Sequence, residues 1–244
     1  MTLIRYICLI GFTIMENLQN IRIAVDAIVF GYKNNDLYVL LIEQQFGTSD
    51  KYWALPGGLV KNDESLSDAV IRELHEETNV QLTFMEQLYT FGDDIYRDSR
   101  NRVISVAYYA LVDASNLDIK ANTDAERVQW CKIDEIPALA FDHNLILEKA
   151  ITRLKAKLTY EPIGFDLLPE EFLFSDLENL YCTILEKEID RRNFRKKILS
   201  YGILEQTENF SPIKTGRPAK LFKFNKLKYN ELTNKGFHFE IKFA

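Results

Sequence analysis

Four charged side chains stand at helical spacing in one short segment: Arg72, Glu73, Glu76 and Glu77. The apolar residues of 65–78 recur every three or four positions, which predicts a helix over this segment. Residues three and four apart share one face of a helix, so the three glutamates can converge. Crowded carboxylate oxygens favour Mg²⁺ or Mn²⁺. Such an ion can bridge phosphate oxygens and activate water for attack on phosphorus.

A solvated acidic helix face is the alternative for two adjacent glutamates taken alone, but the preceding residues extend the pattern. Gly57-Gly58 form a turn at which backbone can approach a bound group closely. From Gly58, five residues lead to Glu64, and seven more lead to RELHEE at 72–77. This long and specific spacing resembles the Nudix box.

The resemblance covers roughly residues 20–155 and implies an α/β/α sandwich around a mixed sheet. The chemistry that it implies is metal-assisted cleavage of the pyrophosphate in nucleoside diphosphates linked to another group. By position, Glu76 and Glu77 would be the main ligands of Mg²⁺ or Mn²⁺, and Glu73 a further ligand or water-orienting base. Arg72 would orient the carboxylates, and the Gly58 carbonyl is a candidate ligand.

One residue departs from the family pattern, which usually has glycine where this chain has Asn79. The position follows the helix and favours a left-handed backbone, which asparagine tolerates best after glycine. We therefore expect the change to be mild and to remove no metal ligand.

The other patterns of the N-terminal part predict a mixed sheet with helices, an α/β or α+β fold. Apolar and β-branched runs predict strands at 21–30, 37–42, 52–55, 80–91, 102–112 and 128–131. Pro56-Gly57-Gly58 predicts a break in the chain. Asp142 can cap a last helix that runs to about Tyr160. We expect His143, beside it, to have a structural or interfacial role.

The sequence EPIG at 161–164 predicts a domain boundary. The predicted units are an N-terminal extension at 1–20 with Met15 as a natural start, a Nudix-like domain at 21–160, and a C-terminal domain at 161–244. In the last, Ser175–Glu178 fits a capping box that opens a helix, and Asp190 can cap a second helix over 191–201. Two strands, at 203–206 and 219–224, flank a loop. This order outlines a winged helix-turn-helix.

The C-terminal part is locally basic, although the whole chain carries a net charge of −6. Residues 187–228 hold 12 basic and 4 acidic side chains, whereas residues 1–161 hold 16 and 24. A helix in the major groove and a wing on the phosphates would use seven basic residues: Arg191, Arg192, Arg195, Lys196, Lys197, Arg217 and Lys220. For the helix alone, a solvated basic face on an interaction domain is the alternative.

Together these features closely resemble the Nudix-related transcriptional regulators, in which a Nudix-like domain is fused to a winged helix. The matching stretches are IPALAFDH at 136–143, EPIGFDLLP at 161–169, RRNFRKKI at 191–198 and GRPAKLFKF at 216–224. The resemblance implies a cytoplasmic, homodimeric bacterial regulator that binds double-stranded operator DNA and controls NAD cofactor or sugar metabolism. Its effector would be ADP-ribose, a related nucleotide or a sugar, bound by the Nudix domain.

Two functions stay open. The first is a DNA-binding regulator that senses a ligand and can also retain hydrolysis. The alternative is a pyrophosphatase for ADP-ribose or a related nucleoside diphosphate derivative, whose C-terminal part only dimerises or positions substrate. The basic helix and wing favour the first, and the intact glutamates favour the second. Phe46, Tyr52 or Trp53 could stack on a base, although packing is the expected role of Trp53.

The cysteines and the N-terminus favour a cytoplasmic protein without a membrane partner. Cys8, Cys131 and Cys182 are odd in number and form no CxxC pair, which argues against a disulfide framework or a zinc ribbon. The apolar N-terminal run contains Arg5 and is too short for a membrane span.

Overall fold

The computed structural model describes residues 20–45, 51–82, 85–115, 119–121, 126–211 and 218–244. Phe46, Arg217 and the predicted extension up to residue 19 lie outside these residues. Within them, no helix is both long enough and apolar enough to cross a membrane.

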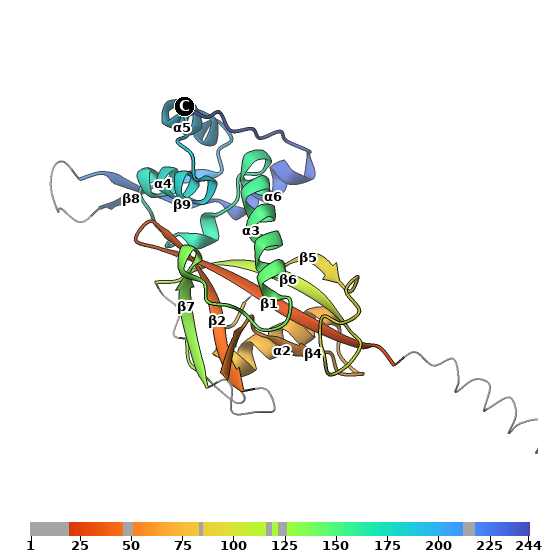
Figure 1. Ribbon diagram of the computed structural model, residues 1–244. Helices are drawn as coiled ribbons and strands as arrows, with labels where there is room; N and C mark the ends of the chain where they lie inside the picture. Colours follow the sequence, from red (N-terminus) through yellow and green to blue (C-terminus); the bar gives the residue numbers. More distant parts are fainter. Residues whose placement is uncertain (1–19, 46–50, 83–84, 116–118, 122–125, 212–217) are drawn as a thin grey trace, which may run out of the picture.

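Seven of the described strands form one mixed sheet (Figure 1). They are β1 (Arg22–Lys33), β2 (Asp36–Gln45), β3 (Lys51–Ala54), β4 (Gly57–Leu59), β5 (Glu86–Phe91), β6 (Val103–Asp113) and β7 (Arg127–Lys132), which the short η1 (Ile133–Glu135) follows. β1 and β6 run parallel, whereas the other pairs are antiparallel. The strands predicted at 21–30 and 37–42 form a hairpin, β1 and β2, that turns at Asn34 and Asn35, which both have positive φ.

Helices cover both faces of this sheet. Every residue from Val25 to Tyr32 of β1 is buried, which is typical of a strand with a layer on each side. α2 (Leu66–Thr78) packs its apolar stripe against one face. α3 (His143–Tyr160) packs against the other and runs on toward the C-terminal domain (Figure 1). The predicted α/β/α sandwich with a mixed sheet is confirmed.

Two local predictions are wrong. The strand predicted over 80–91 begins only at Glu86. The break predicted at Pro56-Gly57-Gly58 is present only at Leu55-Pro56, between β3 and β4, because Gly57 and Gly58 belong to β4, which pairs with β1. A Cβ on Gly57 would lie 2.2 Å from the Val25 carbonyl oxygen, so glycine allows the two backbones to pair this closely. No alternating apolar pattern marks such a short strand.

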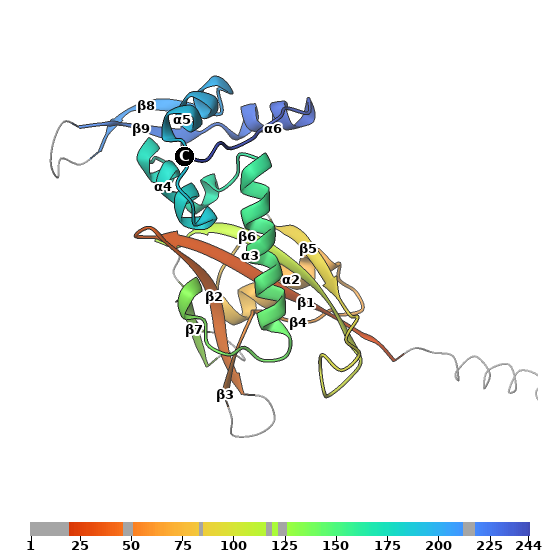
Figure 2. The ribbon, with the colours of Figure 1, turned by 45° about the horizontal axis from the view of Figure 1, so that its top comes forward.

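The C-terminal elements have winged-helix order, as predicted. They are η2 (Phe165–Leu167), α4 (Phe174–Leu185), α5 (Arg191–Ser200), β8 (Leu204–Phe210), β9 (Lys220–Phe224) and α6 (Lys226–Asn234). β8 and β9 form a hairpin that projects away from the rest of the molecule (Figure 2). A bridge between Phe172 and Phe222 ties the hairpin to the segment before α4.

The predicted start of α5 is confirmed, whereas that of α4 is wrong in register. The Asp190 side chain caps α5 by accepting a hydrogen bond from the Asn193 amide at 3.0 Å. α4 begins one residue earlier than the predicted box, because the Asp176 carboxylate accepts from the amide of Leu173 at 3.0 Å. Ser175 therefore lies inside the first turn.

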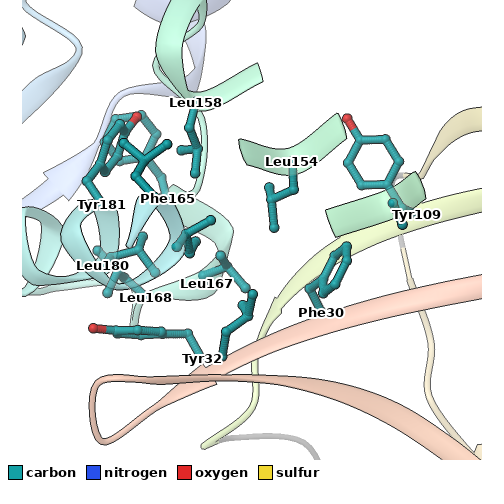
Figure 3. Packing of buried hydrophobic residues seen from close by; sticks show 14 of the residues in the cluster. Phe30, Tyr32, Tyr109, Leu154, Leu158, Phe165, Leu167, Leu168, Leu180 and Tyr181 are labelled. Carbon is teal, nitrogen blue, oxygen red and sulfur yellow. The ribbon is translucent and has the colours of Figure 1, made fainter. Parts of the chain in front are cut away.

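One hydrophobic cluster continues from the seven-stranded sheet into the C-terminal elements. Figure 3 shows Phe30 of β1 and Leu154 of α3 together with Phe165 of η2 and Leu180 and Tyr181 of α4. The Tyr181 hydroxyl, deep in this cluster, donates to the Ile163 carbonyl at 2.8 Å. The two domains therefore share a core instead of being joined by a free linker.

Candidate functional site

Arg72 holds the carboxylates of the predicted box on the exposed side of α2. Its guanidinium donates two hydrogen bonds to Glu64, at 2.9 and 2.6 Å, in a bidentate arrangement. It also bonds Glu73 at 2.7 Å and Glu76 at 3.2 Å. Arg72 therefore has the orienting position that the resemblance implies.

The guanidinium and burial shift the pKa values of two of these carboxyls in opposite directions. The hydrogen bonds from Arg72, then that from the Lys61 amide, hold the pKa of Glu64 at about 2. Burial raises the pKa of Glu73, although Arg72 acts in the opposite sense. Glu73 thus pairs with a cation while it lies in a partly desolvated position.

Glu77 faces away from this group, toward the glycine turn. It is only 4% exposed, and one of its oxygens accepts from the Gly57 amide at 2.8 Å. The other accepts from Gln44 of β2. Gly58 lies against Glu73, since a Cβ there would be 2.5 Å from a Glu73 carboxylate oxygen. The helix and the turn are therefore fitted closely together, as the pair of glycines predicts.

The three glutamates do not gather into one cluster. Among the described residues, no group of three or more His, Cys, Asp or Glu side chains is arranged to hold a metal ion. Glu73 and Glu76 lie beside Arg72, and Glu77 binds the turn. Glu73 and Glu77 offer hard oxygen donors beside the glycine turn, and Glu76 offers a further one beside Arg72, which is the donor chemistry that magnesium prefers.

Asn79 adopts the left-handed conformation expected after the helix. Its φ and ψ are 60° and 11°, and its amide donates to the His75 carbonyl at 3.0 Å. The substitution of the usual glycine is thus accommodated, and the glutamates keep their places on α2.

A buried polar network that the sequence analysis missed lies behind the turn. Arg97, from the loop between β5 and β6, makes two hydrogen bonds to Asp142 at 2.9 and 2.5 Å. Its guanidinium also lies 3.6 Å from Asp26 of β1, whose carboxylate accepts from Ser105 of β6. The side chains of Asp26 and Arg97 are 8% and 5% exposed, so these charges are buried together.

His143 joins this network to the segment before the glycine turn. Its Nδ1 accepts from the Leu55 amide at 3.0 Å, so in the neutral ring the proton is on Nε2. Nε2 lies 3.4 Å from Asp26. Burial lowers the pKa of His143, while Asp26 acts in the opposite sense. The structural role expected of His143 is what the structure shows, and Asp142 binds Arg97 without capping α3 through its side chain.

The basic residues predicted to bind DNA divide into two groups on α5. Arg192, Arg195 and Lys196 are exposed. The guanidinium of Arg195 also stacks on the Phe174 ring, 4.3 Å from its centre. Arg191 instead bonds Asn179 at 3.0 Å, and Lys197 donates to the Glu240 carbonyl at 2.8 Å.

The wing contributes one further described residue of the predicted set. Lys220, at the start of β9, lies 3.7 Å from Glu208 and 5.9 Å from the centre of the Phe210 ring. Arg217 lies outside the described residues. The exposed cations of α5 and this hairpin come from adjacent elements of one domain.

Of the three aromatic residues that could stack on a base, the structure describes Tyr52 and Trp53. Tyr52 is 43% exposed on β3, whereas Trp53 packs against the main cluster, as expected. Arg127 lies 5.6 Å from the centre of the Trp53 ring.

Two domain families match consecutive parts of the chain. Residues 20–154 match the NUDIX domain, and residues 164–224 match the NrtR DNA-binding winged helix domain. The ADPR responsive transcriptional repressor NtrR of Acinetobacter baylyi is 31% identical over 204 residues. The matched part covers 82% of this chain and 80% of that repressor.

Solved structures agree over both domains. The crystal structure of Shewanella oneidensis NrtR complexed with a 27mer DNA superposes with a TM-score of 0.73 at 30% identity, covering 90% of this chain and 98% of that one. The NUDIX domain of the same protein complexed with ADP ribose superposes with a TM-score of 0.51 at 32% identity. That match covers 57% of this chain and 92% of that one.

Proposed function

Because the chain belongs to the NrtR family, in which a NUDIX domain precedes an NrtR DNA-binding winged helix domain, we propose that it is a transcriptional repressor whose DNA binding responds to ADP-ribose. The observation that carries the proposal is the presence in one chain of the NUDIX box and of an exposed basic face on α5. The related A. baylyi repressor responds to ADPR, and the S. oneidensis protein binds a 27mer DNA.

The DNA-binding surface that we propose is the outer face of α5 together with the β8–β9 hairpin. Arg192, Arg195 and Lys196 would reach bases and phosphates from the helix, and Lys220 with Arg217 would contact phosphates from the wing. Arg191 and Lys197 are engaged within the protein and would contribute less. A single α5 is short and can contact only a short stretch of DNA. A homodimer that places two copies of α5 on two half-sites therefore fits this mode of binding.

A double substitution tests this surface. In Arg192→Ala/Lys196→Ala, we expect affinity for duplex DNA from upstream of the gene to fall, with a salt dependence shallower by about two ion contacts. The control, Lys33→Ala/Lys61→Ala, removes two exposed lysines from the NUDIX domain and should leave both quantities unchanged. Equal affinity of the α5 variant and the wild type in fluorescence anisotropy would refute the assigned helix.

The ligand is tested on the protein–DNA complex. ADP-ribose should change the affinity of the full chain for the operator, whereas AMP and ribose 5-phosphate at the same concentration should not. Calorimetry without DNA should show saturable binding of ADP-ribose. A response to a free pentose but not to ADP-ribose would replace the nucleotide effector with a sugar.

Hydrolysis of the bound ligand is a second candidate, favoured by the intact Arg72–Glu64–Glu73–Glu76 group. Glu73, Glu76 and the Gly58 carbonyl would hold Mg²⁺, which supplies a polarised phosphate oxygen and an activated water when bound. Chromatography after incubation with ADP-ribose and Mg²⁺ should then detect AMP. The same yield from Glu76→Gln as from the wild type would exclude this activity.

The proposed regulator acts in the cytoplasm of a bacterium, where its DNA is. A reducing compartment suits the described cysteines, Cys131 and Cys182, which are both free thiols. Localisation of a fluorescent fusion to the nucleoid would support this assignment.

A further inference from the structure

One unexplained feature is a cavity between the two domains, whose lining contains none of the charged residues of the box. It has a volume of about 590 Å³, within the range of small-molecule sites. The end of β6, the C-terminal end of α3, residues 162–166 and α6 line it. Asp142 and His143, at the other end of α3, belong to the Arg97 network. Lys157, which lines the cavity, follows His143 by 14 residues, or about 21 Å along the axis of α3.

We propose that this cavity binds a small organic cation, an amine carried on a flat apolar body. The proposal stands apart from ADP-ribose binding, because it uses none of the residues of the box. Three properties of the lining lead to it: its flat apolar walls, its excess of carboxylates and one buried hydroxyl that makes no hydrogen bond of regular geometry among the described residues.

The walls suit a flat apolar body. Phe165 and Phe224 stack with ring centres 4.2 Å apart and an angle of 11° between their planes. Leu111 and Ile163 complete the apolar part of the lining. A planar ligand can lie against such surfaces and release water from them.

The charges of the lining favour a cation. The lining contains two lysines, Lys157 and Lys226, and four carboxylates. The carboxylates are those of Glu86, Asp113, Glu161 and Asp166. Lys157 is already shared between Glu86 and Glu161, 3.4 Å from the latter. Asp166 lines the cavity with an exposed side chain. An ammonium group beside Asp166 would pair with its carboxylate.

Tyr109 supplies the second and independent observation. It is 4% exposed and lines the cavity, and its hydroxyl oxygen makes no hydrogen bond of regular geometry among the described residues. Burial, and then the neighbouring Glu86 carboxylate, raises the pKa of Tyr109. A buried hydroxyl without a partner costs free energy unless a ligand satisfies it. A bound amine could donate a hydrogen bond to this hydroxyl oxygen. The hydroxyl of Tyr229, which also lines the cavity, already donates to Glu161.

Three probes of one shape test the proposal: tryptamine, 3-ethylindole and indole-3-propionate, which are cationic, neutral and anionic. By calorimetry on the full chain, tryptamine should bind saturably and at least about tenfold more tightly than indole-3-propionate, since a hydrogen bond between charged groups contributes at least about 1.4 kcal/mol. Saturating ADP-ribose should not displace it. Absence of tryptamine binding, or equal binding of the anion, would overturn the proposal.

Variants locate the bound probe. Tyr109→Phe and Asp166→Asn should each weaken tryptamine binding while DNA affinity is unchanged. Thr233→Trp places an indole in the cavity from an exposed position on α6 and should abolish binding. Asn234→Trp, one residue on and outside the lining, is the matched control and should bind as the wild type does. Binding that survives Thr233→Trp contradicts the site.

Discussion

At the scale of single residues, Arg72 organises the box, because its one guanidinium bonds three carboxylates of two elements. Glu64 comes from the loop before α2, while Glu73 and Glu76 belong to the helix. This bonding fixes the helix against the loop in the absence of any ligand. The box is thereby preorganised for whatever it binds.

The low pKa of Glu64 predicts an acid-dependent stability. Its pKa is about 2 when folded, against an ordinary 4.5, so the pair stabilises the fold fully above about pH 4.5 and loses that effect as pH falls toward 2. The stability difference between wild type and Glu64→Gln should therefore shrink between pH 5 and pH 3. Urea unfolding at several pH values measures it.

The adjacent carboxylate provides the control for this experiment. Asp63→Asn replaces an exposed side chain and should leave the pH profile of stability parallel to that of the wild type. A stability difference for Glu64→Gln that is constant from pH 5 to pH 3 would contradict the role assigned to the Arg72–Glu64 pair.

The residues of the box were predictable because their spacing along the chain is itself the signal. Arg72 with Glu76, and Asn79 after the helix, follow from helical geometry alone. Arg97 was missed because its partner, Asp142, is 45 positions away, and no local pattern joins them. Asp26 was hidden within an apolar strand for the same reason.

At the scale of elements, the buried Arg97 attaches the loop between β5 and β6 to the start of α3. Breaking a buried ion pair leaves carboxylates uncompensated, so Arg97→Met should lower the free energy of unfolding by about 3–5 kcal/mol. Arg100→Met changes an arginine of the same loop whose side chain is 55% exposed and should cost less than about 1 kcal/mol. Denaturant unfolding compares them, and equal losses would show that Arg97 has no special role.

Elements with strong periodicity were predicted well, whereas those formed by tertiary contacts were not. α2, α5 and the β1–β2 hairpin followed from apolar spacing, caps and turn residues. β4 exists because Gly57 admits close pairing with β1. α6 was not predicted, since none of its residues is buried and its apolar pattern is weak.

At the scale of the whole molecule, the shared core predicts that the two domains unfold together. Both tryptophans, Trp53 and Trp130, lie in the NUDIX domain and so report only on that half. Leu180→Ala, in α4, removes a fully buried side chain at a cost of about 2–5 kcal/mol. For this variant, the midpoint of thermal unfolding measured by tryptophan fluorescence should fall by roughly 5–15 °C. The midpoint measured by the circular dichroism of the helices should fall by the same amount.

An exposed leucine of the same domain is the control. Leu227, at 84% exposed, contributes little to any core, so Leu227→Ala should leave both midpoints in place. If Leu180→Ala instead separates the fluorescence and dichroism transitions, the winged helix unfolds on its own.

The opposite charges of the two halves have a consequence for the approach to DNA. The N-terminal 161 residues carry eight more acidic than basic side chains, while the region around α5 and the wing is strongly basic. In the field of a polyanion, such a protein experiences a torque as well as an attraction. In the proposed mode of binding, the NUDIX end would turn outward before contact, so a larger share of collisions would begin with α5 facing the DNA. Orientation would thus be selected during diffusion, before any base is contacted.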